Sequence, residues 1–261
     1  MKKTKLPNGD EFFCLNKGEA SLLYTDLFEK RSYFRFDIAI EAGVTVIDVG
    51  ANIGLFALLA SREAEGVRVI SLEPLPPIYS VLRANYDLHK IRGAALPYGV
   101  GRRIERASFT FYSDNTALSG RFADVEEERD LLLRILENRF SEIPHSLLEG
   151  LAEQGLTKET YECEIRPLSN ILRETHVERI GLLKIDVEKA ELDVLEGIED
   201  ADWQRIDQLV VEVHDIDNRL RQICELFYSR GFEVQYSQGV AFVQTGLYDV
   251  CASRRKRDRW V

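Results

Sequence analysis

Short apolar runs alternate with amphipathic segments along most of the chain. Apolar runs bounded by turn residues predict buried strands, and the segments between them have the three- and four-residue spacing of helices. The predicted strands are residues 45–49, 67–72, 94–100 (a strand with its exit loop), 181–186, 208–213, 232–236 and 247–252. Four helices are predicted between them: one begins at about Leu55, one covers residues 77–88, one begins at Ala190 and one covers residues 217–230. This alternation predicts an α/β, Rossmann-like fold, with a doubly wound and mostly parallel seven-stranded sheet that ends in an antiparallel pair.

Two segments stand apart from this alternation. Residues 1–43 begin with a predicted hairpin, whose turn is Pro7-Asn8-Gly9-Asp10, and continue as helix. One face of that helix would carry Leu22, Leu23, Leu27 and Phe28. Residues 115–160 are polar, helical in pattern, and include an acidic run at residues 126–128. A long insertion at the carboxyl edge of such a sheet is typical of a helical lid over the substrate, with a solvated decoration as the alternative.

We therefore expect residues 1–261 to form one domain. With 45% hydrophobic and 30% charged residues, the chain can bury a large core beneath a well-solvated surface. The expected parts are an N-terminal hairpin with helices (1–43), a cofactor-binding half (44–114), a lid insertion (115–160), a catalytic half (161–252) and a basic tail (253–261).

Charge and cysteine usage narrow the partners and the compartment. The net charge of −10 disfavours a protein that binds nucleic acid over a broad face. No apolar run approaches the roughly 20 residues of a membrane span, and the basic N-terminus is not followed by a secretory apolar region. The four cysteines are far apart, as expected of free thiols in a cytoplasmic protein. The basic tail is either a solvated end or a docking segment for an acidic carrier protein.

The first long strand leads into the loop Asp48-Val49-Gly50-Ala51-Asn52-Ile53-Gly54. Gly50 allows a tight turn, and Gly54 allows the next helix to approach closely. A dinucleotide loop would read G-x-G-x-x-G, but Asn52 replaces one of those glycines. The carboxylate of Asp48 would repel a pyrophosphate and suits a cation, such as the ammonium of S-adenosylmethionine. The loop therefore favours S-adenosylmethionine, with Asp48, Gly50, Ala51, Asn52 and Gly54 as expected cofactor-binding residues.

Glu73 ends the next strand, 19 residues after Gly54. A carboxylate at this position of a doubly wound fold can accept both hydroxyls of a ribose, although a lone Glu73 could equally be a surface residue. Pro74 ends the strand and fixes the turn. Tyr98 and Gly99, at the exit of the third strand, are further candidates for cofactor binding.

Several separated motifs together resemble the FkbM-type methyltransferases. They are the loop from Asp48 to Gly54, the pair Glu73-Pro74, and the segment Leu183-Lys184-Ile185-Asp186-Val187-Glu188-Lys189-Ala190-Glu191. The last matches the family signature L-K-I-D-V-E-G-A-E except at Lys189, where the family has glycine. Residues 6–33 and 119–124 resemble members embedded in polyketide and nonribosomal peptide assembly lines.

The resemblance covers roughly residues 6 to 252 and implies a class I methyltransferase fold. It also implies O-methylation, commonly of hydroxyls on carrier-tethered intermediates or sugars. Through the resemblance alone, Tyr33 and Ser119 become candidates for cofactor contacts. If the family's glycine needs a positive φ, Lys189 costs about 1 kcal/mol or blocks space; if glycine only begins the helix, the change is harmless.

Transfer of a methyl group to a hydroxyl calls for a base that takes the hydroxyl proton. His214 follows the strand at residues 208–213, which places it at the carboxyl edge, and its ordinary pKa near 6.5 suits this role. A polar residue at a strand end is the alternative. The carboxylate that orients the imidazole would be Glu188, then Asp186, then Glu212.

A lysine or a metal ion could neutralise the carboxylates of Asp186, Glu188 and Glu212. Lys184, two residues before Asp186 on the same face of its strand, either pairs with a carboxylate or reaches the site. The carboxylates could hold Mg²⁺. We expect no metal, because a histidine base makes the ion unnecessary.

The sequence thus predicts an S-adenosylmethionine-dependent O-methyltransferase with His214 as general base. The expected acceptor is a hydroxyl on a natural-product intermediate, a polyketide or peptide acyl chain on a carrier protein. The alternatives are a free sugar or small-molecule hydroxyl, methylated with Mg²⁺ assistance, and a non-catalytic S-adenosylmethionine-binding module. The missing G-x-G-x-x-G disfavours an NAD-dependent oxidoreductase, and no N-P-P-Y-like segment supports nucleic-acid methylation.

Overall fold

The computed structural model describes residues 1–154 and 156–254, and all structural statements below concern these residues. Its main sheet has seven strands in the order β11-β12-β10-β9-β3-β4-β5. In chain order they are β3 (Thr45–Val49), β4 (Arg68–Leu72), β5 (Gly93–Leu96), β9 (Leu182–Ile185), β10 (Gln208–His214), β11 (Glu233–Ser237) and β12 (Leu247–Ser253). Only β12 runs antiparallel to its neighbours. The expected α/β fold, with its mostly parallel seven-stranded sheet and closing antiparallel pair, is confirmed.

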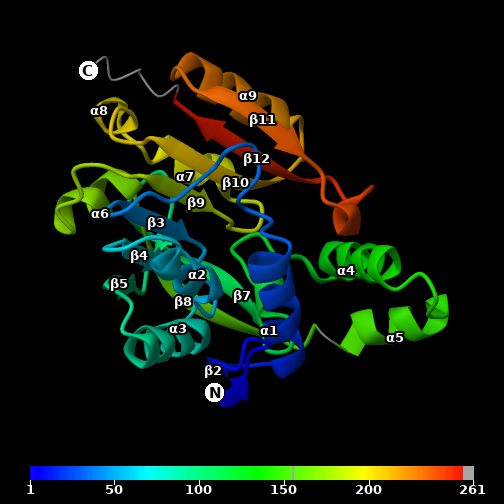
Figure 1. Cartoon of the computed structure of the whole chain (residues 1–261). Helices are drawn as coiled ribbons and strands as arrows, with labels where there is room; N and C mark the ends of the chain where they lie inside the picture. The colour runs from blue at the N-terminus through cyan, green and yellow to red at the C-terminus, as the bar shows by residue number, and fades with distance from the viewer. Residues whose placement is uncertain (155, 255–261) are drawn as a thin grey trace.

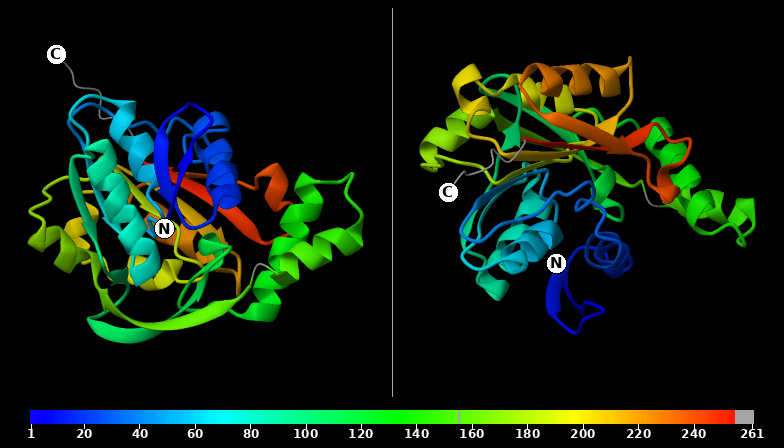
Figure 2. Two further views of the ribbon diagram at one scale, coloured as in Figure 1. Left: turned by 90° about the horizontal axis from the view of Figure 1, so that it is seen from below. Right: turned by 45° about the horizontal axis from the view of Figure 1, so that its top comes forward.

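Helices cover both faces of this sheet (Figures 1 and 2). One face packs against α2 (Leu55–Glu63) and α3 (Pro76–His89). The other packs against α6 (Leu168–Glu174), α7 (Glu191–Glu196), α8 (Asp200–Trp203) and α9 (Arg219–Ser229). Side chains alternate between the two faces of a strand, so Val46 lies in one core and Ile47 in the other. The strands are therefore apolar on both sides, which explains their continuous hydrophobic runs.

The N-terminal segment forms the expected hairpin and helix. Strands β1 (Lys2–Lys5) and β2 (Glu11–Cys14) pair antiparallel, followed by α1 (Lys17–Tyr24) and the π-helical turn η1 (Thr25–Glu29). The expectation that Leu22 shares the apolar face is wrong, because its side chain is 43% exposed while Leu27 is buried. Leu22 precedes Leu27 by five residues, which is about 140° around a regular α-helix, so the two side chains point in different directions.

A second, three-stranded sheet was not expected from the sequence. It consists of β6 (Gly99–Val100), β7 (Glu105–Tyr112) and β8 (Lys158–Arg166). The single strand expected at residues 94–100 is therefore wrong in its second half: β5 ends at Leu96, and β6 pairs with β8 instead. Pro97 stands between the two strands and has no N–H to donate to a ladder, which favours this break.

The insertion contains two helices, α4 (Val125–Arg139) and α5 (His145–Gln154), that project from the body of the protein (Figure 2). Asp124 caps α4 by accepting hydrogen bonds from the backbone N–H of Glu126 and Glu127. Asn138 of α4 donates to the carbonyl oxygens of Ala241, in η3 (Val240–Phe242), and Val243. The insertion thus leans on the loop between β11 and β12 (Figure 1).

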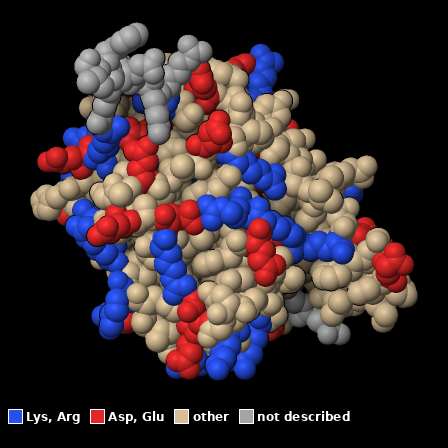
Figure 3. Space-filling model, in the orientation of Figure 1, with Lys and Arg blue, Asp and Glu red and all other residues tan. Residues whose placement is uncertain are grey.

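The surface carries both signs of charge. Lysine, arginine, aspartate and glutamate side chains are interspersed over the face seen in Figure 3. At the end of β12, the Arg254 guanidinium donates to the carbonyl oxygens of Trp203, Ile206 and Arg230. Most of the expected basic tail, residues 255–261, lies outside the described residues. Within the described part of the chain, no helix combines the length and the apolar character that crossing a membrane requires.

Candidate active site

A cavity opens at the carboxyl ends of β3 and β9, where the order of the strands reverses direction. Its empty space is about 1030 Å³, part of which is open to solvent. This is the place where open α/β sheets bind their ligands. Most of the expected cofactor-binding residues line it: Tyr33, Gly50, Ala51, Asn52, Glu73, Pro74, Tyr98, Gly99 and Ser119. Asp186 and Glu188, two of the three expected catalytic residues, line it as well.

The two glycines of the cofactor loop serve different purposes. Gly50 has φ +73°, and a Cβ at this position would stand 1.7 Å from the carbonyl oxygen of Asp186. Only glycine therefore lets the ends of β3 and β9 approach one another. Gly54 has φ +90°, and its Cβ would lie 2.7 Å from Cδ1 of Leu82 in α3. Gly54 thus supports helix packing, as expected, but does not line the cavity.

Glu73 presents a buried carboxylate at the end of β4. Its Oε2 accepts from the backbone N–H of Asn52 at 3.1 Å and its Oε1 from that of Leu75 at 3.0 Å. Each oxygen retains a second lone pair for a ligand hydroxyl. Burial raises the pKa of Glu73 to about 7, against the lowering effect of these two hydrogen bonds. The fixed carboxylate suits the ribose position that the sequence indicated.

Asp48 lies behind the cavity wall rather than in it. Its side chain is fully buried, accepts from the Ser71 hydroxyl at 3.0 Å and lies 3.2 Å from Nζ of Lys184. The expected direct contact between Asp48 and the cofactor ammonium is therefore corrected, because the Asp48 side chain is fully buried and does not line the cavity. Lys184 donates to the carbonyl oxygen of Gly50 at 2.7 Å and also lines the cavity. Asp48 thus supports the cofactor loop through Lys184, so both readings of Lys184 hold.

A chain of hydrogen bonds that the sequence did not reveal links α1 to the cofactor loop. Glu19 accepts from the backbone N–H of Ala117 at 2.9 Å and lies 3.0 Å from the hydroxyl of Thr116. That hydroxyl is also 2.9 Å from Oδ1 of Asn52. The hydroxyl proton can be fully donated to only one of the two acceptors, and a protonated Glu19 would supply a second proton for this pair of contacts. The pKa of Glu19 is raised to about 7, mainly by burial, which is consistent with a protonated carboxyl group.

Three carboxylates gather on the acceptor side of the cavity. One oxygen of each of Asp186, Glu188 and Glu212 lies within 4.8 Å of the others. Tyr33 donates its hydroxyl proton to Asp186 at 3.0 Å, and Lys184 lies 3.3 Å from the same oxygen. Burial, with repulsion from Asp186, holds the pKa of Glu212 well above its usual range. The cluster therefore attracts protons or cations.

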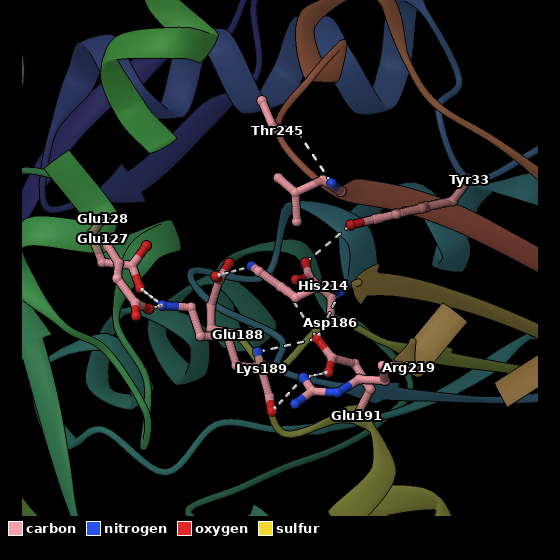
Figure 4. Close-up of polar contacts among 11 residues, drawn as sticks. Tyr33, Glu127, Glu128, Asp186, Glu188, Lys189, Glu191, His214, Arg219 and Thr245 are labelled. Atoms are coloured by element: carbon pink, nitrogen blue, oxygen red, sulfur yellow. Dashed lines mark hydrogen bonds and ion pairs between the residues drawn. The ribbon is translucent and has the colours of Figure 1, made fainter. Parts of the chain in front are cut away.

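His214 does not line the cavity, and its imidazole lies between the carboxylates of Glu188 and Glu191 (Figure 4). Its Nε2 lies 3.1 Å from Oε2 of Glu188, and its Nδ1 lies 2.9 Å from Oε1 of Glu191. Burial alone would lower the pKa of His214, but the two carboxylates outweigh it and hold the pKa well above the usual range. The imidazole is therefore charged near neutral pH. This corrects the expectation that His214 faces the acceptor directly.

Glu188 is the carboxylate that faces the cavity. Burial raises its pKa, and His214 opposes that rise. Glu188 Oε2 and His214 Nε2 are close, yet neither has a well-aligned hydrogen-bond partner among the described residues. The pair can therefore accept a further polar group.

Glu191 was not among the carboxylates expected to orient the imidazole, although it ends the family-like segment Leu183–Glu191. It is fully buried and accepts from the backbone N–H of Lys189 at 3.1 Å and from Arg219 at 2.6 Å. Its position as the last residue of the segment Leu183–Glu191, at the start of α7, was the available signal. Glu191 orients the imidazole of His214 from the side opposite Glu188.

Lys189 adopts the conformation that explains the family's glycine. Its φ is +71°, and that of Glu188 is +47°, so both lie in the left-handed region. Of the two alternatives left open by the sequence, the positive φ is therefore the one that applies. The Lys189 ammonium contacts Glu127 and Glu128 of α4 at 2.7 and 2.8 Å.

The geometry agrees with comparisons to known proteins. A family model described as the methyltransferase FkbM domain matches residues 48–234, which include the cofactor loop, Glu73 and Glu188. This chain belongs to the FkbM methyltransferase family. It is 39% identical to 31-O-demethyl-FK506 methyltransferase FkbM of Streptomyces tacrolimicus over 254 residues, which cover 97% of each chain.

Other relatives differ in size. The chain is 30% identical to methyltransferase sdnD of Sordaria araneosa, covering 85% of this chain and 86% of that protein. It is 35% identical to the AMB antimetabolite synthetase AmbE of Pseudomonas aeruginosa, over 95% of this chain but 12% of that protein. The solved structure of methyltransferase FkbM from Methylobacillus flagellatus KT superimposes with a TM-score of 0.53 at 14% identity, covering 88% of this chain and 47% of that one, which supports the fold.

As a member of this family, the protein is a methyltransferase that uses S-adenosylmethionine as its methyl donor. The cavity fits that cofactor. The buried Glu73 carboxylate has free lone pairs for ribose hydroxyls, and Gly50, Ala51 and Asn52 of the loop line the cavity beside it. The empty space is of the size that proteins use for ligands of this class.

Proposed function

We propose that this methyltransferase methylates a hydroxyl oxygen of a natural-product intermediate. The observation that carries the proposal is the Glu188 carboxylate, which faces the cavity and is backed by His214 at 3.1 Å. The names of two relatives, a 31-O-demethyl-FK506 methyltransferase and an antimetabolite synthetase, support this class of acceptor.

Glu188 takes the proton in this proposal. S-adenosylmethionine, held by the Gly50 loop and Glu73, would supply a sulfonium methyl group to the acceptor oxygen, with the electron pair of the carbon–sulfur bond leaving on sulfur. The proton of the acceptor hydroxyl passes to a carboxylate oxygen of Glu188. A raised pKa improves Glu188 as a base, because general bases are most effective when their pKa lies near the working pH.

His214 acts through Glu188. As an imidazolium between Glu188 and Glu191, it keeps Glu188 ionised and directed toward the cavity. The role assigned from the sequence, His214 as the base itself, becomes in this proposal that of a positioning residue, because each ring nitrogen lies within 3.1 Å of a carboxylate oxygen and His214 does not line the cavity. Asp186, held by Tyr33 and Lys184, completes the polar wall.

A Mg²⁺-assisted reaction is the second candidate, favoured by the cluster of Asp186, Glu188 and Glu212. Carboxylate oxygens are the ligands that this ion prefers, and a bound cation would acidify an acceptor hydroxyl. Turnover in the presence of a chelator, followed by addition of Mg²⁺, separates the two candidates. Turnover that persists in the chelator supports Glu188 acting without metal, and restoration by Mg²⁺ alone supports the second candidate.

We further propose that α4 and α5 act as a lid over the acceptor, and that the acceptor is a polyketide or peptide acyl chain on a carrier protein. The synthetase relative, which contains a segment similar to almost the whole of this chain, supports an assembly-line setting. A free sugar or other small-molecule hydroxyl is the alternative acceptor.

The test is incubation with methyl-labelled cofactor and hydroxyacyl substrates, either free or linked to a carrier protein. Label in an ether linkage, lost in Glu188→Gln but retained in the exposed variant Glu225→Gln, is the expected result. Label found only on nitrogen or carbon would overturn O-methylation. Cofactor binding with no transfer to any acceptor would favour a non-catalytic binding module.

A further inference from the structure

Lys189 connects the helical insertion to the loop that carries Glu188. Its ammonium lies 2.7 Å from Oε2 of Glu127 and 2.8 Å from Oε1 of Glu128, both in the first turn of α4 (Figure 4). The Lys189 side chain is 9% exposed and that of Glu128 is fully buried, whereas Glu127 is 66% exposed. The contact with Glu128 is therefore the shielded half of the pair, where solvent screens the attraction least.

The backbone at this point is costly for a lysine. Lys189 has φ +71° and Glu188 has φ +47°, a region that residues with a Cβ rarely adopt in succession. Glycine, which the family signature has at this position, would adopt it freely. Lysine is retained in this conformation by contacts on both sides: its side chain binds α4, and its carbonyl oxygen accepts from Arg219 at 2.8 Å.

The insertion also contacts Glu188 from a second direction. A Cβ built on Gly120 would stand 3.0 Å from Cβ and 3.8 Å from Cγ of Glu188, so the segment leading into α4 packs on the aliphatic part of the Glu188 side chain. Gly120 itself is held to β7 by hydrogen bonds with the backbone of Thr110. The insertion thus contacts both residues of the turn: Gly120 lies against Glu188, and α4 binds Lys189.

We propose that Lys189 is a positioning residue for methyl transfer: its ion pair with Glu128 holds α4 against the 188–189 turn and thereby aims the Glu188 carboxylate into the cavity. This inference rests on the proposed role of Glu188 and extends it to the insertion. The expected cofactor-binding residues lie on other elements: the loop from Gly50 to Gly54 follows β3, and Glu73 follows β4. The ion pair should therefore affect the acceptor step and leave cofactor binding unchanged.

The test uses Lys189→Met, Glu128→Gln, the double variant, and Lys189→Gly. Glu127→Gln, at the exposed end of the cluster, and Lys3→Met, from the exposed pair with Glu11, are matched controls. For each, kcat and KM for the acceptor are measured together with the Kd of S-adenosylhomocysteine. A misaimed catalytic group lowers the rate by about tenfold or more. We expect kcat to fall by this factor in Lys189→Met and in Glu128→Gln, and the double variant should lose no more than either single variant.

Lys189→Gly separates the orientation of Glu188 from backbone strain, because glycine adopts the positive φ without strain but lacks the ammonium group. It should lose kcat as Lys189→Met does, and the Kd of S-adenosylhomocysteine should stay within about twofold of the parent in every variant. Unchanged kcat in Lys189→Met, additive losses in the double variant, or a parallel loss of cofactor affinity would each overturn the proposal.

Hydrogen–deuterium exchange provides a readout that does not depend on turnover. In Lys189→Met, exchange should increase together in residues 125–139 and 186–190; an increase confined to residues 125–139 would contradict the coupling. If the parent protein transfers no methyl group to hydroxyls while both segments still respond together, the ion pair couples them and the proposed function is the part that fails.

Discussion

The imidazole of His214 lies 3.1 Å behind the carboxylate of Glu188 and on the side away from the cavity. This order of the two residues decides which of them meets the acceptor. The carboxylates on either side of His214 hold its pKa well above the usual range, and a protonated imidazole stabilises a base rather than acting as one. Each experiment below tests one consequence of that arrangement or of the cavity around it.

Glu188→Gln removes the group that accepts the proton while preserving the shape of the side chain. We expect kcat to fall by roughly 10² to 10⁴, the contribution of a general base. The Kd of S-adenosylhomocysteine, measured by calorimetry, should change little because Glu73 and the Gly50 loop are intact. The exposed variant Glu225→Gln serves as the control. A Glu188→Gln enzyme with parental kcat would remove Glu188 from the mechanism.

The pH dependence of kcat/KM should show an acid limb. Glu188 accepts a proton only when ionised, and burial raises its pKa, so activity decreases as pH falls through that raised pKa. In His214→Asn the nearby positive charge is lost, the pKa of Glu188 rises further, and the acid limb moves to higher pH. The exposed His145→Asn should leave the profile in place. An acid limb that stays where it was in His214→Asn would show that His214 does not act through Glu188.

Glu73→Gln should weaken cofactor binding selectively. A hydrogen bond to a charged group contributes about 1.5–3 kcal/mol, so the Kd of S-adenosylhomocysteine should rise by roughly tenfold to a hundredfold. Calorimetric titration measures this directly, and Glu65→Gln, exposed and away from the cavity lining, is the control. An unaltered Kd would assign Glu73 to the packing of the loop rather than to the ribose.

Gly50→Ala and Gly43→Ala form a matched pair, because both glycines have φ +73°. At Gly43 nothing lies within 4 Å of an added Cβ, so only the left-handed conformation is penalised, at about 1 kcal/mol. At Gly50 the Cβ would stand 1.7 Å from the carbonyl oxygen of Asp186. We expect a loss of more than about 4 kcal/mol in the free energy of unfolding, measured in urea. Equal losses at both sites would show that β3 and β9 can move apart at little cost.

Glu19 should make stability fall as the pH rises. Its pKa is about 7 in the folded protein and 4.5 as an ordinary glutamate, so the folded state binds more protons between these values. The free energy of unfolding should decrease over that window by up to about 3 kcal/mol through Glu19, and Glu73 acts in the same direction.

Urea unfolding at pH 5 and pH 7 measures the effect. Glu19→Gln should show a smaller decrease than the parent, while Glu29→Gln, on the exposed side of η1, should match the parent. If Glu19→Gln keeps the full decrease, the protonated form inferred from the Thr116 contacts is wrong.

Local pattern determined most of the fold. The inner strands β3, β4, β9 and β10 are largely apolar on both faces, and each is followed by a segment with helical periodicity, so they could be identified from the sequence. The turn at Pro7–Asp10 and the roles of Gly50 and Gly54 also followed from local rules, because a turn or a positive φ is a property of a few adjacent residues.

The parts that were missed depend on contacts between distant segments. The sheet formed by β6, β7 and β8 pairs residues about fifty apart, as Ala107 with Cys163, and no local period indicates such a partner. Likewise, Asp48 and His214 end or border apolar strands as expected. Whether each faces the ligand depended on what stands in front of it, which is Lys184 for one and Glu188 for the other.

The sequence by itself determined the fold class, the place of the cofactor loop and the family, because these are encoded in hydrophobic period, strand ends and short motifs. Only the tertiary structure decided how the acidic residues share their work. Glu188 faces the cavity, Glu191 and His214 stand behind it, and Lys189 binds α4 some sixty residues away in the sequence. The physical reason is that the pKa, burial and aim of a side chain depend on charges and packing from other segments, which the folded chain alone brings together.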